Sequence, residues 1–534
     1  MNKNMKKSII IAGVALVLVV ALILVVVLVP WGEGGNTPGE IDRGTDMILS
    51  TNEDGMHTAK VKTNEKGELE NNSFGTLINY KPAQIEKIEM STAQGNYTFL
   101  LETPVNADGT TEATIYTLEG FEDYNLQATN PSLLASAVCF VEFTKVADLT
   151  GENAAEFGFD NPRAQAKVFY NDGTYSVLRM GDKAPGGTSC YIQYGDNETV
   201  YIANLAELEP MLLSITDLFS TAVNTSAYNA SDDSFDKITL GGSHLSEEVV
   251  IVANTENALN CYYLMASHGN VPVNTLEGSN IAGSIRNLTA SEVVCVNPDA
   301  NNLKEYGLST PFATAKTTYT YKNTEYDDAG NKTRDEEVKV PISLMASESD
   351  SEGNVYLMEE GGKLIYKIAA STIPWATTSM EKLQSEYVLN PVYDALGSVV
   401  FKAEGKTYQF DLSTKQVAGT DDAGNETTTT EYVVTLDNKE IDADQFYILY
   451  QDLTLMEYGG TDTTTIAGDK LLTVTYNYLT DRASDTVAFC QTDTQKVIPF
   501  VNGERTGYVY SADISAIISN IAKLASGKEI ASIR

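Results

Sequence analysis

The longest apolar stretch of the chain lies close to its start. Residues 1–7 form a short basic segment, and residues 9–29 form an unbroken apolar run. As a helix, this run is long enough to cross ~30 Å of hydrocarbon. A cleaved signal peptide would have an apolar core of only about 7 to 15 residues. The pattern predicts a transmembrane signal anchor over residues 1–30. The lysines place the N-terminus in the cytoplasm, so we expect a single-pass protein of the cell membrane whose bulk is extracytoplasmic.

Beyond residue 80, apolar and polar positions alternate in short segments rich in β-branched and aromatic residues, and the same order of segments returns. Each return opens with a hairpin, continues with a strand and a helix, and closes with three or four strands and a helix. Strands followed by helices, without βαβ alternation, indicate an α+β fold with mainly antiparallel sheets. We predict three tandem related α+β domains after the transmembrane helix, at residues 81–228, 229–390 and 391–534, of which the last is the most divergent.

The first long helix of each domain is predicted from its apolar face. In the first domain Asn130 is placed to cap this helix, with Pro131 at its first position. The counterparts are predicted at residues 281–294 and 443–455.

Residues 31–80 connect the predicted anchor to the first domain. Residues 31–46 are rich in Gly, Pro and charge, which predicts a flexible tether. The strand-like segments 58–62 and 69–76 flank a turn sequence at residues 64–67, so we expect them to form a hairpin.

Two heptapeptides are related across the distance of one domain. Residues 156–162 read Glu-Phe-Gly-Phe-Asp-Asn-Pro, residues 305–311 read Glu-Tyr-Gly-Leu-Ser-Thr-Pro, and residues 457–461 are a third, worn copy. A glycine closes a helix cheaply in the left-handed conformation, and a proline shortly after it prevents the helix from resuming. We predict a helix-to-strand corner in each domain. Its structural residues are Gly158, Pro162, Gly307, Pro311 and Gly459.

The chain is strongly acidic. It holds 73 Asp and Glu against 36 Lys and Arg, and its formal net charge is −37. Such a surface repels phosphate and favours solubility, cations or basic partners, so we expect no nucleic acid partner.

Several short motifs suggest chemistry but lack a necessary part. Residues 181–188 have the glycine spacing of a phosphate loop, yet Gly187 stands where the lysine is required. Ser379 and Lys382 have the spacing of the first motif of penicillin-binding enzymes, and residues 505–507 mimic the third, but the middle motif is missing. We predict no catalytic residue and no cofactor.

The metal-ligating residue types do not form a predicted site either. His57, His244 and His268 show no zinc spacing. The Asp-rich segments 327–331 and 421–425 lack the ligand pattern of an EF-hand loop, and weak Ca²⁺ sites there stay open.

The five cysteines give an odd count. Cys139 and Cys295 lie in apolar runs, where a thiol acts as a small hydrophobe. Cys190, Cys261 and Cys490 lie in strand-like segments, and we favour free thiols at all five positions.

The order of strand pair, helix, aromatic-Gly-Leu-x-x-Pro corner, strands, Val-Tyr and helix resembles the bacterial family called domain of unknown function 4340. The resemblance covers most of residues 81–390, while the third domain keeps only Gly459 of the corner. It implies a membrane-anchored envelope protein. Some members are encoded near ABC-type transporters of the gliding-motility kind, and the family supplies no catalytic residues.

Three functions are compatible with these patterns. The first is a non-enzymatic accessory or scaffold protein that associates with membrane transporter subunits or other envelope proteins. The second is a cell-wall glycan-binding protein, for which Trp31 and Trp375 are the available large stacking platforms. The third is a glycan hydrolase with a carboxylate pair that sequence cannot select. We favour the first, with the bilayer as the contact of residues 9–29.

Overall fold

The computed structural model describes residues 47–69, 74–106, 109–223, 234–286, 288–327, 330–420, 426–461, 465–492 and 494–534. The predicted anchor at residues 1–30 and the tether at 31–46 lie outside these ranges. Over the described ranges, no helix has both the length and the apolar character needed to cross a membrane. Contacts divide the chain into two compact units, Met1–Glu122 with Thr129–Leu213, and Asp123–Ala128 with Ser214–Arg534.

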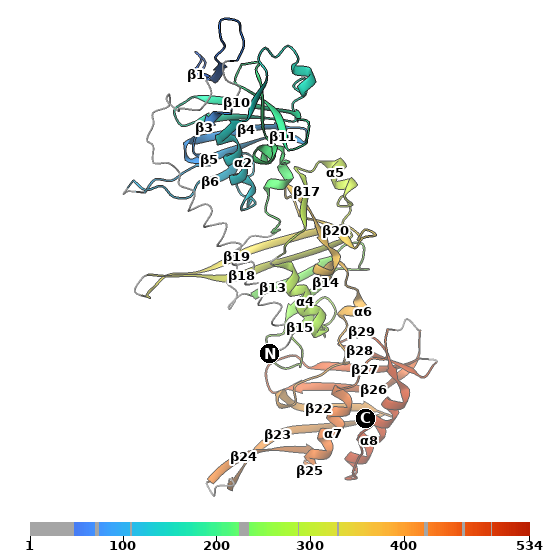
Figure 1. Cartoon of the computed structure of the whole chain (residues 1–534). Helices are drawn as coiled ribbons and strands as arrows, with labels where there is room; N and C mark the ends of the chain where they lie inside the picture. Colours follow the sequence, from blue (N-terminus) through green and yellow to red (C-terminus); the bar gives the residue numbers. More distant parts are fainter. Residues whose placement is uncertain are drawn as a thin grey trace. The chain divides into compact units, whose positions relative to one another are not determined.

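The first unit contains an eight-stranded antiparallel sheet (Figure 1). From edge to edge its strands are β6 (Ile115–Leu118), β5 (Gly95–Glu102), β4 (Ile85–Thr92), β9 (Ala164–Tyr170), β10 (Tyr175–Lys183), β11 (Ser189–Tyr194), β12 (Val200–Asn204) and β8 (Lys145–Asp148). Every second residue of the central β9 is buried, and helix α2 (Asn130–Cys139) contacts this strand. Pro131 lies in the first turn of α2 as predicted, but the residue at the cap position is Thr129 rather than Asn130.

The segment before this sheet is paired differently from the prediction. Strand β1 (Met47–Thr51) pairs with β2 (His57–Val61), and β3 (Gly75–Asn79) pairs with β7 (Phe140–Phe143). The predicted pairing of residues 58–62 with 69–76 is therefore wrong, and of the hairpin only the turn at residues 64–67 and one antiparallel bridge, between Thr63 and Leu69, form among the described residues. The physical reason is burial: β3 is buried over its first four residues, so its apolar side chains belong to the core and not to an exposed hairpin.

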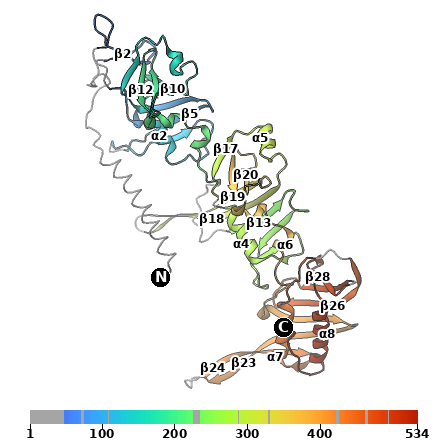
Figure 2. The same cartoon turned by 45° about the vertical axis from the view of Figure 1, so that its right-hand side comes forward.

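The second unit contains two nine-stranded sheets, drawn from a second side in Figure 2. The first of them, in order, is β16 (Val271–Pro272), β15 (Tyr263–Met265), β14 (Val249–Ala253), β13 (Ser234–Gly241), β18 (Ala313–Tyr326), β19 (Lys332–Ala346), β20 (Asn354–Glu359), β21 (Leu364–Ala369) and β17 (Glu292–Val296). Helix α4 (Thr275–Ile285) packs on it through the buried Ile281 and Ile285, and the Tyr319 hydroxyl of β18 donates to the Ala282 carbonyl, 2.8 Å away.

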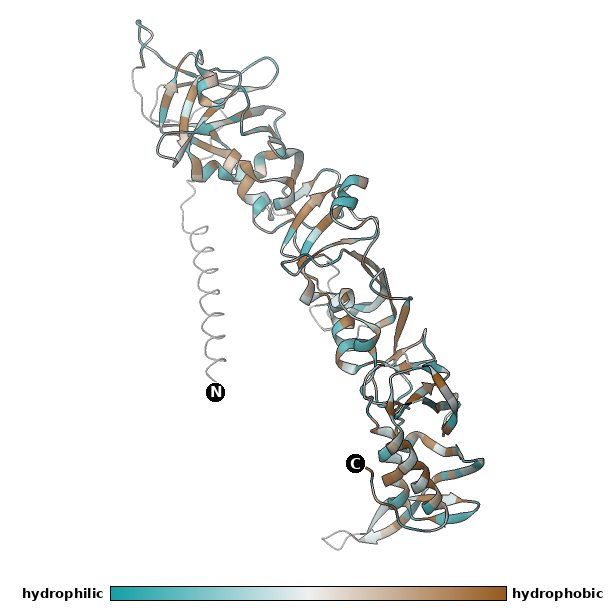
Figure 3. Ribbon diagram, turned by 90° about the vertical axis from the view of Figure 1, so that its right-hand side faces the viewer, coloured by the Kyte–Doolittle hydropathy of each residue, from teal (hydrophilic) through white to brown (hydrophobic). Residues whose placement is uncertain are grey.

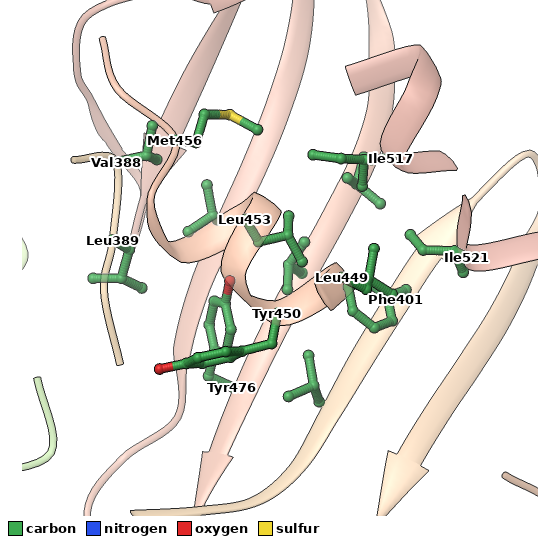
Figure 4. Packing of buried hydrophobic residues seen from close by; sticks show 14 of the residues in the cluster. Val388, Leu389, Phe401, Leu449, Tyr450, Leu453, Met456, Tyr476, Ile517 and Ile521 are labelled. Atoms are coloured by element: carbon green, nitrogen blue, oxygen red, sulfur yellow. The ribbon is translucent and has the colours of Figure 1, made fainter. Parts of the chain in front are cut away.

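The other sheet of this unit carries the C-terminal helices. Its strands are β25 (Lys439–Ile441), β24 (Glu426–Leu436), β23 (Lys406–Thr420), β22 (Leu396–Ala403), β26 (Ile466–Tyr478), β27 (Asp485–Thr492), β28 (Lys496–Val501) and β29 (Glu504–Arg505), with β30 (Val509–Tyr510) paired to β28. Helix α7 (Ala443–Thr454) begins at the predicted residue because the Asp442 carboxylate accepts from the N–H groups of Asp444 and Gln445. Figure 4 shows Leu449 and Leu453 of α7 beside Phe401 and Tyr476, with Ile517 and Ile521 of α8 (Ser511–Ala525) in the same cluster.

The remaining helices are short turns. They are α3 (Leu205–Leu208), α5 (Ala300–Glu305), α6 (Met380–Leu383), η1 (Pro82–Gln84), η2 (Ala154–Phe157), η3 (Glu209–Leu212), η4 (Ile215–Leu218), η5 (Ala370–Thr372), η6 (Pro374–Ala376) and η7 (Tyr393–Ala395).

The helix predicted at residues 281–294 is misplaced. Helix α4 begins six residues earlier, where Asn274 accepts hydrogen bonds from the N–H groups of Leu276 and Glu277. The run Glu292–Val296 is the edge strand β17, because Val293, Val294 and Val296 are β-branched and favour extended backbone.

The three sheets share one order of strands. The first strand of each opening hairpin lies beside the strand that begins the second half: β4 beside β9, β13 beside β18, and β22 beside β26. The protein is thus an α+β chain of mostly antiparallel sheets with few helices, and Figure 3 shows hydrophobic positions interleaved with polar ones along these strands. The boundaries of three domains stay a prediction, because Leu259, Leu264 and Val271 from the second sheet join the core of the third.

Candidate functional site

The two predicted glycine corners are helix caps. Gly158 and Gly307 adopt φ of 86° and 70°, directly after η2 and shortly after α5. The N–H of the next residue reaches back five positions in both places, from Phe159 to the Ala154 carbonyl at 3.2 Å and from Leu308 to the Leu303 carbonyl at 2.7 Å. This is the hydrogen-bond pattern of a Schellman cap. The prolines that end each motif, Pro162 and Pro311, lie just before β9 and β18.

The third corner does not form, and the prediction for Gly459 is wrong. Gly459 is not among the described glycines with positive φ. Its N–H donates to the Tyr508 carbonyl at 2.8 Å, and the neighbouring Gly460 forms an antiparallel bridge with Tyr508. Tyr508 directly precedes β30, which pairs with β28. Residues 459 and 460 therefore occupy the position beside this strand that β17 occupies beside β21 in the second sheet.

The sequences that mimic catalytic motifs have structural roles. Residues 184–188 join β10 to β11 and open no helix, so they offer no helix N-terminus to a phosphate. The Ser379 hydroxyl accepts from the Lys382 N–H and so caps α6, while Lys382 Nζ donates to the Thr377 carbonyl at 2.9 Å. Ser379 and Lys382 therefore do not form the nucleophile and base of an acyl transferase.

A hydroxyl and an imidazole meet closely in the first unit. His57 Nε2 lies 2.8 Å from Thr174 Oγ1 and 2.9 Å from the Tyr80 hydroxyl, and Nδ1 lies 3.0 Å from Thr51 Oγ1. Thr174 donates its proton to Asp172 at 2.6 Å, so its oxygen accepts from Nε2–H. An imidazole that donates to a hydroxyl does not remove its proton, and Thr174 is not activated as a nucleophile. Burial lowers the pKa of His57, and the charge of Asp172 opposes this.

The other ligand-type residues are dispersed. His244 Nδ1 lies 3.0 Å from the Phe312 carbonyl, and His268 lies beside Glu247. No group of three or more His, Cys, Asp or Glu side chains placed to hold a metal occurs among the described residues. All five cysteines are free, and burial raises the pKa of Cys139 and Cys190 to about 11, which keeps both as neutral thiols.

Two features of the described residues bear on ligand binding, the predicted stacking tryptophan and a hollow on the second sheet. Trp375, one of the two predicted stacking platforms, is fully buried and offers no exposed ring, and Trp31 lies outside the described residues. A hollow of about 520 Å³ lies on the second sheet. Two of its charged side chains pair with each other, since Glu360 lies 2.7 Å from Lys316 Nζ, and Glu360 also accepts from the Ser343 hydroxyl.

Two pairs of strands extend beyond their sheets as two-stranded ribbons, which Figures 1 and 2 show at β18–β19 and β23–β24. Strand β13 pairs with β18 as far as Thr320, and beyond that point residues 321–326 and 332–338 pair with each other, with no third strand among the described residues. We call this the charged ribbon. Strand β22 follows β23 only to Asp411, and β25 begins to pair with β24 at Val434. Residues 413–419 and 427–433 therefore form a second ribbon, the threonine ribbon.

Four tyrosine rings gather at the root of the threonine ribbon. The Tyr393 ring centroid lies 5.0 Å from that of Tyr432, 5.1 Å from Tyr447 and 4.8 Å from Tyr450. The Tyr432 hydroxyl donates to the Asp394 carboxylate, and this bond raises the pKa of Tyr432. Tyr432 and Tyr447 are 41% and 42% exposed, so the cluster both holds the ribbon and presents two rings to solvent.

Comparison with known proteins bears on the sequence resemblance. A family model described as Domain of unknown function (DUF4340) matches residues 117–249 and 264–458, more than half of the chain. The resemblance predicted from the sequence is confirmed, and the two matched regions are consistent with tandem copies. They contain the corners at Gly158 and Gly307 and stop before Gly459. No curated protein and no solved structure matches the chain.

Proposed function

Since the chain belongs to the DUF4340 family, a family of unknown function, we propose that it acts by association and not by catalysis. In this proposal it is an accessory or scaffold subunit of a membrane assembly, anchored by residues 1–30, and an ABC-type exporter is the candidate partner. The observation that carries the proposal is the pair of ribbons that leave the sheets of the second unit.

The ribbons are suited to binding because the backbone hydrogen bonding at their outer edges is incomplete among the described residues. A two-stranded hairpin is only marginally stable in water, and the outer edges of both ribbons present backbone N–H and C=O groups beside which the structure describes no further strand. An extended segment of another protein adds to such an edge through main-chain hydrogen bonds. Ribbons that extend from rigid sheets offer this edge without rearrangement of the core.

The test is a pull-down of the intact chain in mild detergent, beside a version that lacks residues 1–30. In a third variant, Asn-Gly replaces residues 415–431 and joins the paired Thr414 and Tyr432. In a fourth, Asn-Gly joins the paired Lys322 and Glu337 of the charged ribbon. We expect the intact chain to recover transporter membrane subunits and the trimmed variants to lose them. Recovery that persists after both ribbons are trimmed would refute the role of the ribbons, and an intact chain that purifies alone would refute association.

Glycan binding is the second candidate, and the exposed rings of Tyr432 and Tyr447 favour it. Tyrosine faces stack on sugars, and the nearby Asp394 carboxylate accepts hydroxyl donors. A glycan array with the Tyr447→Ala variant tests this, with Tyr326→Ala on the charged ribbon as the matched exposed control. Loss of a signal in the first variant alone would support glycan binding. Turnover of cell-wall material would instead indicate the hydrolase.

A further inference from the structure

The two ribbons differ in how their edges are protected. The charged ribbon holds seven charged residues along its short length, and Arg334 pairs with Glu325 and Glu336 at 3.1 and 2.9 Å. Charged side chains on an exposed strand are a usual device against pairing with another chain. The threonine ribbon has only Lys415 and Glu431, which face each other 3.5 Å apart. Its other residues are uncharged.

The cross-strand contacts of the threonine ribbon hold it in one register. Gln416 Nε2 donates to Thr430 Oγ1 at 3.0 Å, and the Tyr432 hydroxyl fixes the root to Asp394. The residues at 416–419 are Gln, Val, Ala and Gly, of which Val417 has the largest apolar side chain. The edge of β23 thus carries a single charge, that of Lys415, which pairs with Glu431, and has no described strand beside it.

The charge of the molecule decides which partner fits this edge. Two chains of net charge −37 repel each other wherever their bodies approach. A ribbon of seven residue pairs is about 23 Å long at ~3.3 Å per residue, roughly twice the screening length of ~10 Å in 0.1 M salt. Pairing ribbon to ribbon therefore keeps the acidic bodies apart. An edge without acidic side chains lets another copy approach with less repulsion than the acidic bodies do.

We propose that the edge of β23 over residues 413–419 pairs antiparallel with the same edge of a second copy, on a two-fold axis at Val417. In this register Val417 faces the partner's Val417, and Lys415 faces the partner's Gly419, so no like charges meet. The edge of β24 is less suitable, because it carries the acidic Glu431, whereas the edge of β23 carries the basic Lys415. The result is a continuous four-stranded ribbon between two protomers. This inference rests on the proposed function of association.

Cross-linking tests the register in the full chain. A Val417→Cys variant places two thiols opposite each other, and we expect a disulfide-linked dimer under mild oxidation. Thr324→Cys on the charged ribbon is the matched control, and the parent chain controls for its own five cysteines. Cross-linking at Val417 no greater than at Thr324 would overturn the proposal.

Charge exchange tests the same contact without oxidation. Val417→Lys alone and Val417→Glu alone should each weaken dimerisation about tenfold, because like charges then face each other, and an equimolar mixture should restore it. Dimerisation of the parent chain should also strengthen as salt rises from ~0.02 to ~0.3 M, because screening reduces the repulsion of the bodies. The measurement is sedimentation velocity, with circular dichroism to confirm folding.

The outcomes separate this inference from the proposed function. A monomeric parent chain, or a Val417→Lys variant that dimerises normally, overturns the self-pairing. If, in that case, the variant with the trimmed threonine ribbon still fails to recover the transporter subunits, the proposed association is supported. The edge then binds a strand of another protein.

Discussion

Gly158 and Gly173 adopt almost the same backbone conformation but have different surroundings. Their φ values are 86° and 85°. A Cβ atom at Gly158 would lie 2.7 Å from Asp182 Cγ and 2.9 Å from the Asp182 backbone nitrogen, whereas a Cβ at Gly173 would meet nothing within 4 Å. We expect Gly173→Ala to cost ~1 kcal/mol of unfolding free energy from positive φ alone, and Gly158→Ala to cost ~2 to 3 kcal/mol because overpacking adds to it.

Urea unfolding of the first unit, followed by circular dichroism, measures this difference. Equal losses in the two variants would mean that conformation alone explains the corner. Such caps can be predicted from sequence, because the end of the helix, the glycine and the proline are neighbours in the chain, and the cap depends on these residues alone. The prediction fails at Gly459, because the similar residues there contact Tyr508, which lies 49 positions away in the chain.

His57 gives the first unit a pH dependence of defined sign. Burial lowers its folded-state pKa below the ordinary value of 6.5, so the unfolded chain takes up a proton first as pH falls. The stability contribution is complete above about pH 6.5 and is lost as pH falls from there toward the lowered pKa. We expect the urea midpoint to fall between pH 7.5 and 5.5 by more in the parent chain than in a His57→Gln variant. The idea fails if the two pH profiles are parallel.

At the scale of elements, strand existence could be predicted better than strand length. The sequence pattern predicts strands at residues 407–412 and 432–436, where alternation with apolar residues marks a buried face. The structure extends them to Lys406–Thr420 and Glu426–Leu436. Six of the fifteen added residues are Thr, and the added residues lack apolar alternation because neither face of the threonine ribbon is covered. The ribbons were therefore missed by the sequence reasoning, which found only the polar loops between their strands.

The contact that replaces the third corner has its own signature. A Cβ atom at Gly459 would lie 2.5 Å from the Tyr508 ring, and Gly459 is not one of the described glycines with positive φ. We expect Gly459→Ala to lower the unfolding free energy by ~2 kcal/mol, because the new methyl group overpacks against the ring. In a background that already carries Tyr508→Ala, most of this loss should disappear.

Gly460→Ala is the matched control for that pair. Gly460 has φ of 136°, and its Cβ would lie 3.4 Å from the same ring. Its cost comes from backbone strain, so Tyr508→Ala should not relieve it. A double-mutant cycle in urea with no coupling between Gly459 and Tyr508 would show that the ring does not set the glycine requirement.

At the scale of the whole molecule, the second unit is joined by polar as well as apolar contacts. Arg482, in the connection between β26 and β27, pairs with Glu256, in the connection between β14 and β15, and lies 3.1 Å from Asp485. Asp485 also accepts from Asn502, which in turn donates to the Gly269 carbonyl at 2.9 Å. Sequence alone could not predict this junction, because its residues lie more than 200 positions apart. It explains why residues 229–390 and 391–534 do not separate into two compact units.

Arg482 and Arg334 each pair with two carboxylates, but only Arg482 is buried. Its side chain is 11% exposed and that of Asp485 is 5% exposed, against 45% for Arg334. Arg482→Met leaves Asp485 buried without its cation, and we expect a loss of ~3 kcal/mol or more in the unfolding free energy of the second unit. Arg334→Met should leave the unfolding free energy almost unchanged, because exposed pairs contribute little. Adding Asp485→Asn to Arg482→Met should restore part of the loss by removing the unpaired charge. If Arg482→Met and Arg334→Met cost the same, the buried pair does not stabilise the junction, and the apolar contacts of Leu259, Leu264 and Val271 hold the two sheets together.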